Sequence, residues 1–187
     1  GGRLKFMKAL VLTDYLKFEY QDVPGPVCKD DEVLVNVKAC AICGSDIHGY
    51  DGTSGRRQPP VIMGHEAAGV ITKTGKNVTQ FKAGDRVTFD STIYCGKCWY
   101  CRHGKVNLCE SRMVLGVSCG DYRKPGAMAE HVAVPERVLY KLPDSVTYVQ
   151  AAVVEPLSVA VHAASVSKLR LGDHVVIVGA GTIGLLL

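Results

Sequence analysis

The 187-residue sequence has no apolar stretch long enough to cross a bilayer. Its longest apolar run, "VVIVGAGTIGLLL" at residues 175–187, is shorter than the ~18 residues that a membrane span needs. The N-terminal segment "GGRLKFMKALVLTDY" lacks the continuous apolar core of a secretory signal. Residues 1–6 are interpreted as an added leader before a natural start at Met7. These absences predict a cytoplasmic protein that does not bind membranes.

The sequence also lacks any block of like charge. Its net charge of +4 is spread along the chain, whereas nucleic-acid-binding surfaces need clustered basic residues. We therefore expect no nucleic-acid partner. Internal repeats and low-complexity tracts are absent too, and the length fits one domain or slightly more.

Cysteine, in contrast, is plentiful, and four of the eight cysteines follow one spacing: Cys95-x2-Cys98-x2-Cys101-x7-Cys109. Thiols stay reduced in the cytoplasm, so such a cluster is more typical of a metal site than of disulfides. Four thiolates around a tetrahedral zinc leave no open position, which predicts a structural site. The alternatives are an iron–sulfur cluster, a DNA-binding zinc finger and unliganded thiols. The late Cys109 argues against the first, and the absence of a basic helix argues against the second.

Between Lys8 and Lys141 the chain reads as short β-segments separated by Gly, Pro and Asp. This pattern predicts a mostly antiparallel barrel or sandwich. The expected strands lie in "KALVL", "EVLVNVKA", "AAGVITKTG", "DRVTFD" and "AEHVAVP", with weaker candidates in "PVIMG" and "VLYKLP".

The pattern changes after Pro143. "TYVQ" at residues 147–150 has the spacing of a capping box, and the Ala-rich segment after it has helical periodicity. Pro156 should interrupt that helix or start a second one. "GDHVVIVGAGTIGLLL" then predicts a turn, a buried strand, a Gly-rich turn and a helix, the order of a parallel α/β unit. One such unit cannot form a sheet, so we expect the chain to be a piece of a longer protein.

Three glycines in that turn, Gly179, Gly181 and Gly184, form a G-x-G-x-x-G pattern between an expected strand and helix. In this context the backbone can approach a pyrophosphate at the helix N-terminus, which predicts NAD or NADP binding. The alternative is a Gly-rich turn without a ligand. The acidic residue that separates NAD from NADP would follow Leu187; NAD is the preferred reading.

Three more stretches, "CAICGSDIHGYDG" (40–52), "GHEAAG" (64–69) and "VEPLSVAVHA" (154–163), complete a set of five motifs. Together the five resemble the zinc-dependent medium-chain alcohol dehydrogenases, and the third stretch is most similar to their polyol (sorbitol-type) branch. The resemblance runs from Met7 to Leu187 and covers about the first half of such a protein. It implies a mixed β and α/β fold: a GroES-like β-barrel catalytic domain at 7–155 with a structural zinc lobe at 91–112, and the beginning of a truncated Rossmann domain at 156–187.

The resemblance also implies a catalytic zinc, which makes two zinc ions per chain. Cys43 and His65 would be its ligands, with Glu66 or Glu155 as the third. Ser45 and His48 match the proton relay of the family. Cys95, Cys98, Cys101 and Cys109 match its structural zinc lobe.

The implied activity is hydride transfer between NAD(P) and a polyol or related secondary alcohol. A sugar-alcohol phosphate or threonine is an alternative substrate. Tyr50 and the "SGRRQPP" loop are expected to border the pocket, where Arg56 and Arg57 could clamp a phosphate. The alternatives of another class are a non-catalytic zinc-stabilised binding or structural protein and an iron–sulfur electron carrier. A homodimer or homotetramer is expected from the family. Cys28, Cys40 and Cys119 belong to no motif and are interpreted as structural.

Overall fold

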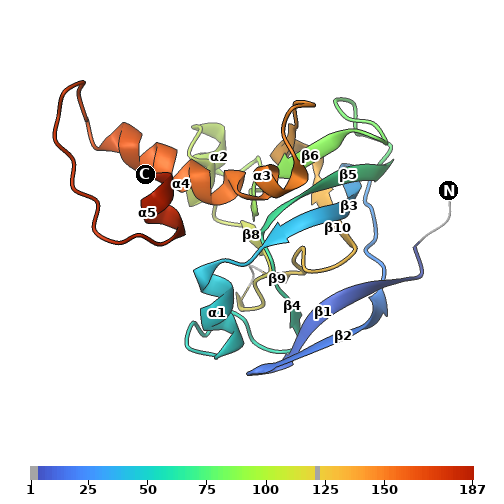
Figure 1. The fold of residues 1–187 in the computed structure, drawn as a ribbon. Coiled ribbons are helices and arrows are strands. Elements are labelled where there is room, and N and C mark those ends of the chain that lie inside the picture. The colour runs from blue at the N-terminus through green and yellow to red at the C-terminus, as the bar shows by residue number, and fades with distance from the viewer. Residues whose placement is uncertain (1–3, 121–122) are drawn as a thin grey trace.

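The computed structural model describes residues 4–120 and 123–187 (Figure 1). Three antiparallel or mixed sheets occupy the first three quarters of the chain, and helices follow them. The arrangement confirms the mostly antiparallel β prediction for this part.

The largest sheet has five strands in the order β10-β3-β5-β6-β11, and all of its pairs are antiparallel. Its strands are β3 (Glu32–Ala41), β5 (Glu66–Thr74), β6 (Arg86–Phe89), β10 (His131–Pro135) and β11 (Leu139–Lys141). Buried Val, Ile and Phe side chains of these strands form the main hydrophobic core. Alternating apolar residues therefore form strands here because one face of the sheet is buried.

Two smaller sheets complete the β-structure. One has the order β2-β1-β4 and the other β7-β8-β9, in which β8 and β9 are parallel. Their strands are β1 (Phe6–Asp14), β2 (Lys17–Pro24), β4 (Val61–Ile62), β7 (Thr92–Ile93), β8 (Met113–Leu115) and β9 (Arg123–Lys124). The seven predicted strand segments between residues 8 and 143 all contain an observed strand, whereas β2, β7, β8 and β9 were not predicted. The last three have only two or three residues, too few to show a periodicity.

Helices follow several strand ends, and the last two extend away from the sheets and contact each other (Figure 1). The helices are α1 (Gly44–Tyr50), α2 (Trp99–Arg102), α3 (Tyr148–Ala152), α4 (Val154–Val166) and α5 (Thr182–Leu186), with 3-10 turns η1 (Val106–Leu108) and η3 (Glu136–Val138). The Thr147–Gln150 capping box is confirmed: the Gln150 backbone N–H donates to Thr147 Oγ1, and Gln150 Oε1 accepts from the Thr147 N–H. Pro156 lies in the first turn of α4, where its missing N–H costs nothing, so it starts a second helix.

The predicted buried strand at residues 175–178 is not observed. This segment has no strand assignment, and Val176 and Val178 are 87% and 95% exposed. A parallel strand needs neighbouring strands for its backbone hydrogen bonds, and the described residues offer none here. The Gly-rich turn and the start of α5 are present, but the Rossmann sheet is not.

No helix in the described parts of the chain combines the length and the apolar character that a membrane crossing requires.

Candidate functional site

Cys43, His65 and Glu66 form a candidate metal centre. One donor atom from each residue lies within 4.8 Å of the other two. Strand pairing explains why they meet: in the β3–β5 register Ala41 lies opposite Glu66, and Cys43 follows β3 by two residues. His65 and Glu66 are buried. The sheet therefore brings Cys43 next to His65 and Glu66, which follow it by more than 20 positions in the sequence.

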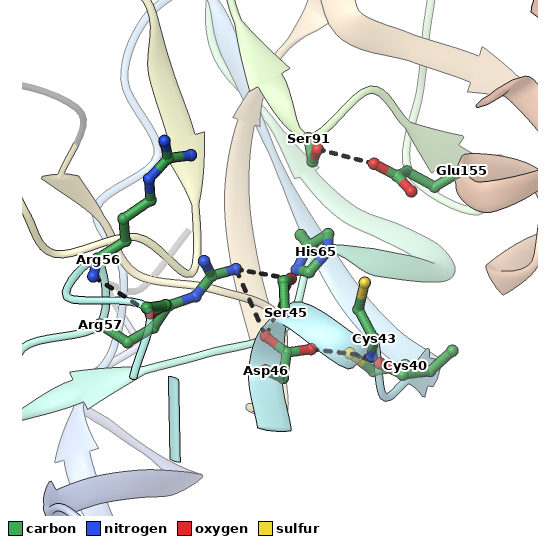
Figure 2. A network of polar contacts seen from close by, with 11 residues as sticks. Cys40, Cys43, Ser45, Asp46, Arg56, Arg57, His65, Ser91 and Glu155 are labelled. Carbon is green, nitrogen blue, oxygen red and sulfur yellow. Dashed lines mark hydrogen bonds and ion pairs between the residues drawn. The ribbon is translucent and has the colours of Figure 1, made fainter. Parts of the chain in front are cut away.

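Asp46 contacts two residues of this centre, Cys43 and His65 (Figure 2). The Cys43 backbone N–H donates to Asp46 Oδ2 at 3.1 Å, which caps α1. The other carboxylate oxygen of Asp46 lies 3.5 Å from His65 Nδ1, and both atoms are buried without a hydrogen-bond partner. A carboxylate beside one imidazole nitrogen leaves the other nitrogen, Nε2, for a metal.

The contact with Asp46 affects the pKa of His65. Burial alone would lower the pKa of His65, but Asp46 and Glu155 outweigh it, and the pKa is raised. Arg57 Nη2 lies 3.7 Å from Asp46 Oδ1, so Asp46 faces a cation on one side and the imidazole on the other. Asp46 was not among the predicted site residues. In the sequence, the one indication of this role is that Asp46 follows the candidate ligand Cys43 by three positions.

A polar cavity of about 410 Å³ opens beside His65. Glu155, in the first turn of α4, lines it and accepts a hydrogen bond from Ser91 Oγ at 3.4 Å (Figure 2). Burial raises the pKa of Glu155, and Glu66 adds to the rise while His65 opposes it. Glu155 lies outside the three-residue metal group. The cavity is lined by Ser45, Arg56, Arg57, His65, Ser91, Thr92, Arg112, Val114, Val117, Cys119 and Glu155.

The predicted relay residues Ser45 and His48 both lie on α1 but make different hydrogen bonds. Ser45 Oγ accepts from Arg57 Nη2 at 3.1 Å and lines the cavity. His48 is exposed and lies 3.2 Å from Thr53 Oγ1 through Nδ1. Ser45 thus lies at the cavity and His48 at the solvent, on neighbouring turns of one helix.

Tyr50 does not line this cavity, contrary to expectation. Its hydroxyl donates to the Leu16 carbonyl at 2.7 Å, and its ring stacks on Phe18 with centroids 5.2 Å apart. It packs against the apolar cluster of Leu12, Val61 and Met63. An aromatic ring next to an apolar cluster gains more from burial there than from facing a polar cavity.

The glycine turn lines a second cavity that also reaches the candidate metal centre. This cavity, of about 480 Å³, is lined both by Cys43, Gly44 and Glu66 and by the three predicted glycines, Gly179, Gly181 and Gly184. Gly179 has φ = +107°, which favours glycine. A Cβ at Gly184 would lie 2.0 Å from the Gly179 carbonyl oxygen, so a side chain there would disrupt the turn.

The four predicted lobe cysteines form a second candidate metal centre, with their sulfur atoms all within 4.8 Å of one another. Backbone N–H groups point at the sulfurs: that of Cys95 donates to Cys109 Sγ at 3.2 Å, and that of Cys98 to Cys95 Sγ at 3.4 Å. Backbone hydrogen bonds lower the pKa of Cys95 to about 6, whereas burial raises that of Cys101 to about 12. All four cysteines are free thiols, and no disulfide joins any two of them.

Both donor sets suit zinc. Four thiolates form a closed tetrahedral site, and Cys, His and Glu leave one position for a further ligand, as catalytic zinc requires. A metal-bound histidine usually has a carboxylate beside its other ring nitrogen. Asp46 Oδ1 lies beside His65 Nδ1 in this way.

A family comparison settles the class of protein. Residues 29–144 match the model of the alcohol dehydrogenase GroES-like domain. The chain belongs to the zinc-type medium-chain alcohol dehydrogenase family. This confirms the resemblance read from the motifs, including its polyol branch.

Polyol enzymes are among the relatives of this chain. It is 39% identical to sorbitol dehydrogenase of Bacillus subtilis over 96% of its length and 51% of that protein. It is 41% identical to D-arabitol-phosphate dehydrogenase of Enterococcus avium over 92% of its length and 48% of that protein. The chain therefore spans about half the length of the curated relatives it matches.

A solved structure described as a zinc-binding dehydrogenase from Sinorhizobium meliloti, bound to NADP, is also similar to this dehydrogenase chain. The TM-score is 0.86 at 36% identity, over 97% of this chain and 51% of that one.

The cysteines outside the two centres have distinct surroundings. Cys28 Sγ donates to the Glu32 carbonyl at 3.2 Å. Burial raises the pKa of Cys40 to about 12, so it behaves as a small apolar side chain. Cys119 lines the polar cavity, a position that its sequence context did not indicate.

The cysteine lobe provides a test. Cys101→Ser is expected to remove one of two zinc ions from the full-length dehydrogenase, because a serine hydroxyl is a poor zinc ligand. Limited proteolysis between residues 94 and 112 should become about 10-fold faster, since metal binding holds the lobe folded.

Elemental analysis after dialysis counts the zinc. The matched control Cys28→Ser, at a cysteine outside both centres, should keep both ions. An unchanged zinc content in Cys101→Ser would show that the lobe holds no zinc.

Proposed function

We propose that the full-length protein is a zinc-dependent dehydrogenase that transfers hydride between NAD(P) and a polyol or related secondary alcohol. One observation carries the proposal: Cys43, His65 and Glu66 lie between two cavities of different character. One cavity is polar, and the other contains the glycine turn. An alcohol and a nicotinamide would then approach the same centre from two sides.

Zinc bound at this centre would supply Lewis acidity and lower the pKa of a substrate hydroxyl. Ser45, on the cavity wall, would accept the hydroxyl proton and pass it towards His48 and solvent along α1. Arg57 donates to Ser45 Oγ and so orients its lone pairs for that transfer. The glycine turn would hold the pyrophosphate close to its backbone and thereby position the nicotinamide near the substrate.

Among the two glutamates, we propose Glu66 as the third zinc ligand and Glu155 as a substrate-binding group. The proximity of Glu66 to Cys43 and His65 supports the first assignment. Glu155 faces the polar cavity, where a carboxylate can accept hydrogen bonds from several hydroxyl groups of a polyol.

Substitution of each glutamate tests this division. Glu155→Gln should lower kcat/KM for a polyol about 10- to 100-fold, because hydrogen bonds to a charged group are lost, while both zinc ions remain. Glu66→Gln should lose the catalytic zinc. Loss of zinc in Glu155→Gln with retention in Glu66→Gln would reverse the assignment.

The relatives support polyols, with and without a phosphate, as the substrate class. The NADP in the Sinorhizobium meliloti structure supports a nicotinamide cofactor. A cytoplasmic location fits the proposal, because the zinc ligands include thiols that must stay reduced.

The decisive experiment uses full-length protein purified without chelators. We expect two zinc ions per chain and reduction of NAD+ or NADP+ in the presence of a polyol. Two zinc ions without oxidation of any polyol, secondary alcohol or threonine would favour a non-catalytic zinc-stabilised protein.

A further inference from the structure

The polar cavity has more cationic than anionic lining residues. Three arginines, Arg56, Arg57 and Arg112, line it, and Glu155 is the one carboxylate among the described residues that do so. Neutral polyols need hydroxyl partners and no such excess of positive charge. A neutral polyol therefore does not account for the three arginines of the cavity.

Arg57 is already used within the protein. Its side chain is buried between Asp46 and Ser45, 3.7 Å from a carboxylate oxygen of the former and 3.1 Å from the hydroxyl of the latter. It supports the candidate metal centre, and its Nη2 is engaged by both partners. The predicted clamp of Arg56 and Arg57 stays a prediction, and Arg57 is the less exposed of its two members.

Arg56 differs from its neighbour. Arg56 is exposed, and no carboxylate in residues 4–120 or 123–187 forms an ion pair with its guanidinium. In Figure 2 the Arg56 side chain extends away from the Arg57–Asp46 pair.

The main chain of Arg56 is nevertheless held in place. Its carbonyl accepts from the Ser118 N–H at 3.1 Å, and Ser118 Oγ donates to the Gln58 carbonyl at 2.9 Å. An anchored backbone lowers the entropy cost of placing the guanidinium on a ligand.

Arg112 approaches the same cavity from a different part of the chain. Its Nη1 donates to the Cys109 carbonyl at 3.2 Å, which ties the side chain to the cysteine lobe. The lobe thus positions a second guanidinium on the cavity that begins at His65.

We infer that Arg56 and Arg112 bind the phosphate of a phosphorylated polyol whose reacting hydroxyl lies at Cys43, His65 and Glu66. This inference rests on the proposed function and narrows its substrate class to sugar-alcohol phosphates. Glu155 then meets the hydroxyl groups between the two ends of the substrate.

A phosphate suits Arg56 and Arg112 better than a carboxylate does. A phosphate monoester carries close to two negative charges near pH 7 and has three terminal oxygens, so two guanidinium groups can bind it from different sides. A carboxylate has one charge and is matched by a single arginine fork. Two arginines from separate segments therefore indicate a dianion.

The test compares D-sorbitol 6-phosphate with D-sorbitol and D-gluconate on full-length protein. We expect kcat/KM to be at least about 100-fold higher for the phosphate than for sorbitol, since two charge-assisted contacts are gained. Arg56→Gln and Arg112→Gln should each lower it about 10- to 100-fold for the phosphate and less than about 2-fold for sorbitol. Arg170→Gln, an exposed arginine outside both cavities, is the matched control.

Binding gives a readout independent of turnover. Calorimetric titration with sorbitol 6-phosphate should show the same losses of affinity in Arg56→Gln and Arg112→Gln. The affinity of the wild-type protein should also fall with rising salt, as charge screening requires.

The outcomes separate the two proposals. Equal use of sorbitol and its phosphate, with no effect of Arg56→Gln, would overturn the phosphate site and leave the dehydrogenase proposal intact. Preference for gluconate would replace phosphate by carboxylate and also overturn the inference. Absence of any nicotinamide-dependent oxidation, with unaltered phosphate binding in both variants, would overturn both proposals.

Discussion

If the full-length protein has the proposed dehydrogenase activity, replacing Cys43 by alanine is expected to lower its kcat/KM at least about 10³-fold and to reduce its zinc content from two ions to one. The thiolate is one of three proposed ligands, and its loss leaves His65 and Glu66 with too few donors to keep the metal. Steady-state kinetics and elemental analysis on the same preparation provide the measurement. The remaining zinc should be that of the cysteine lobe.

Cys40→Ala is the matched control, because Cys40 is close in sequence and partly buried but lies outside the metal group. It should keep both zinc ions and most of the activity. Equal losses in both variants would point to a general effect of disturbing the end of β3 and would contradict the ligand role of Cys43.

Arg57→Ala should destabilise the catalytic domain by about 3–5 kcal/mol, the second-largest effect that we expect. The substitution leaves the buried carboxylate of Asp46 without its cation, and an unpaired buried charge is costly. Chemical denaturation of the zinc-loaded protein, followed by circular dichroism, measures the change in the free energy of unfolding.

Two variants make this prediction specific. Arg57→Lys should keep most of the stability, since it retains the charge, but lower kcat because the ammonium of the shorter lysine does not reach the position of Nη2, the one nitrogen that contacts both Asp46 and Ser45. Arg56→Ala, at the exposed neighbour, should leave stability within about 0.5 kcal/mol. Comparable destabilisation in Arg56→Ala and Arg57→Ala would show that the loop, and not the buried ion pair, is responsible.

Local patterns in the sequence were sufficient for much of the β-structure and for the cysteine lobe. The long strands β3 and β5 alternate or run apolar because one face of their sheet is buried. The four lobe cysteines lie within 15 positions, so their spacing alone indicates that the sulfurs can converge. The Thr147–Gln150 capping box is equally local.

The candidate metal centre could be assigned from sequence only through the family resemblance. Cys43 and His65 are brought together by the pairing of β3 with β5, and residue spacing contains no information about that register. The supporting role of Asp46 and the separate surroundings of Arg56 and Arg57 depend on the same packing. Adjacent in sequence, these two arginines differ because one side chain is buried against a carboxylate and the other is exposed.

The strand expected at 175–178 is a local prediction that the structure does not confirm. Its apolar residues predict a buried parallel strand, but strand formation needs partner strands, which the described residues do not supply. The sequence by itself therefore determined the local elements, the cysteine lobe and, through its motifs, the family. Only the tertiary structure decided which glutamate lies with Cys43 and His65, and which arginine is buried against Asp46, because both depend on contacts between different segments of the chain.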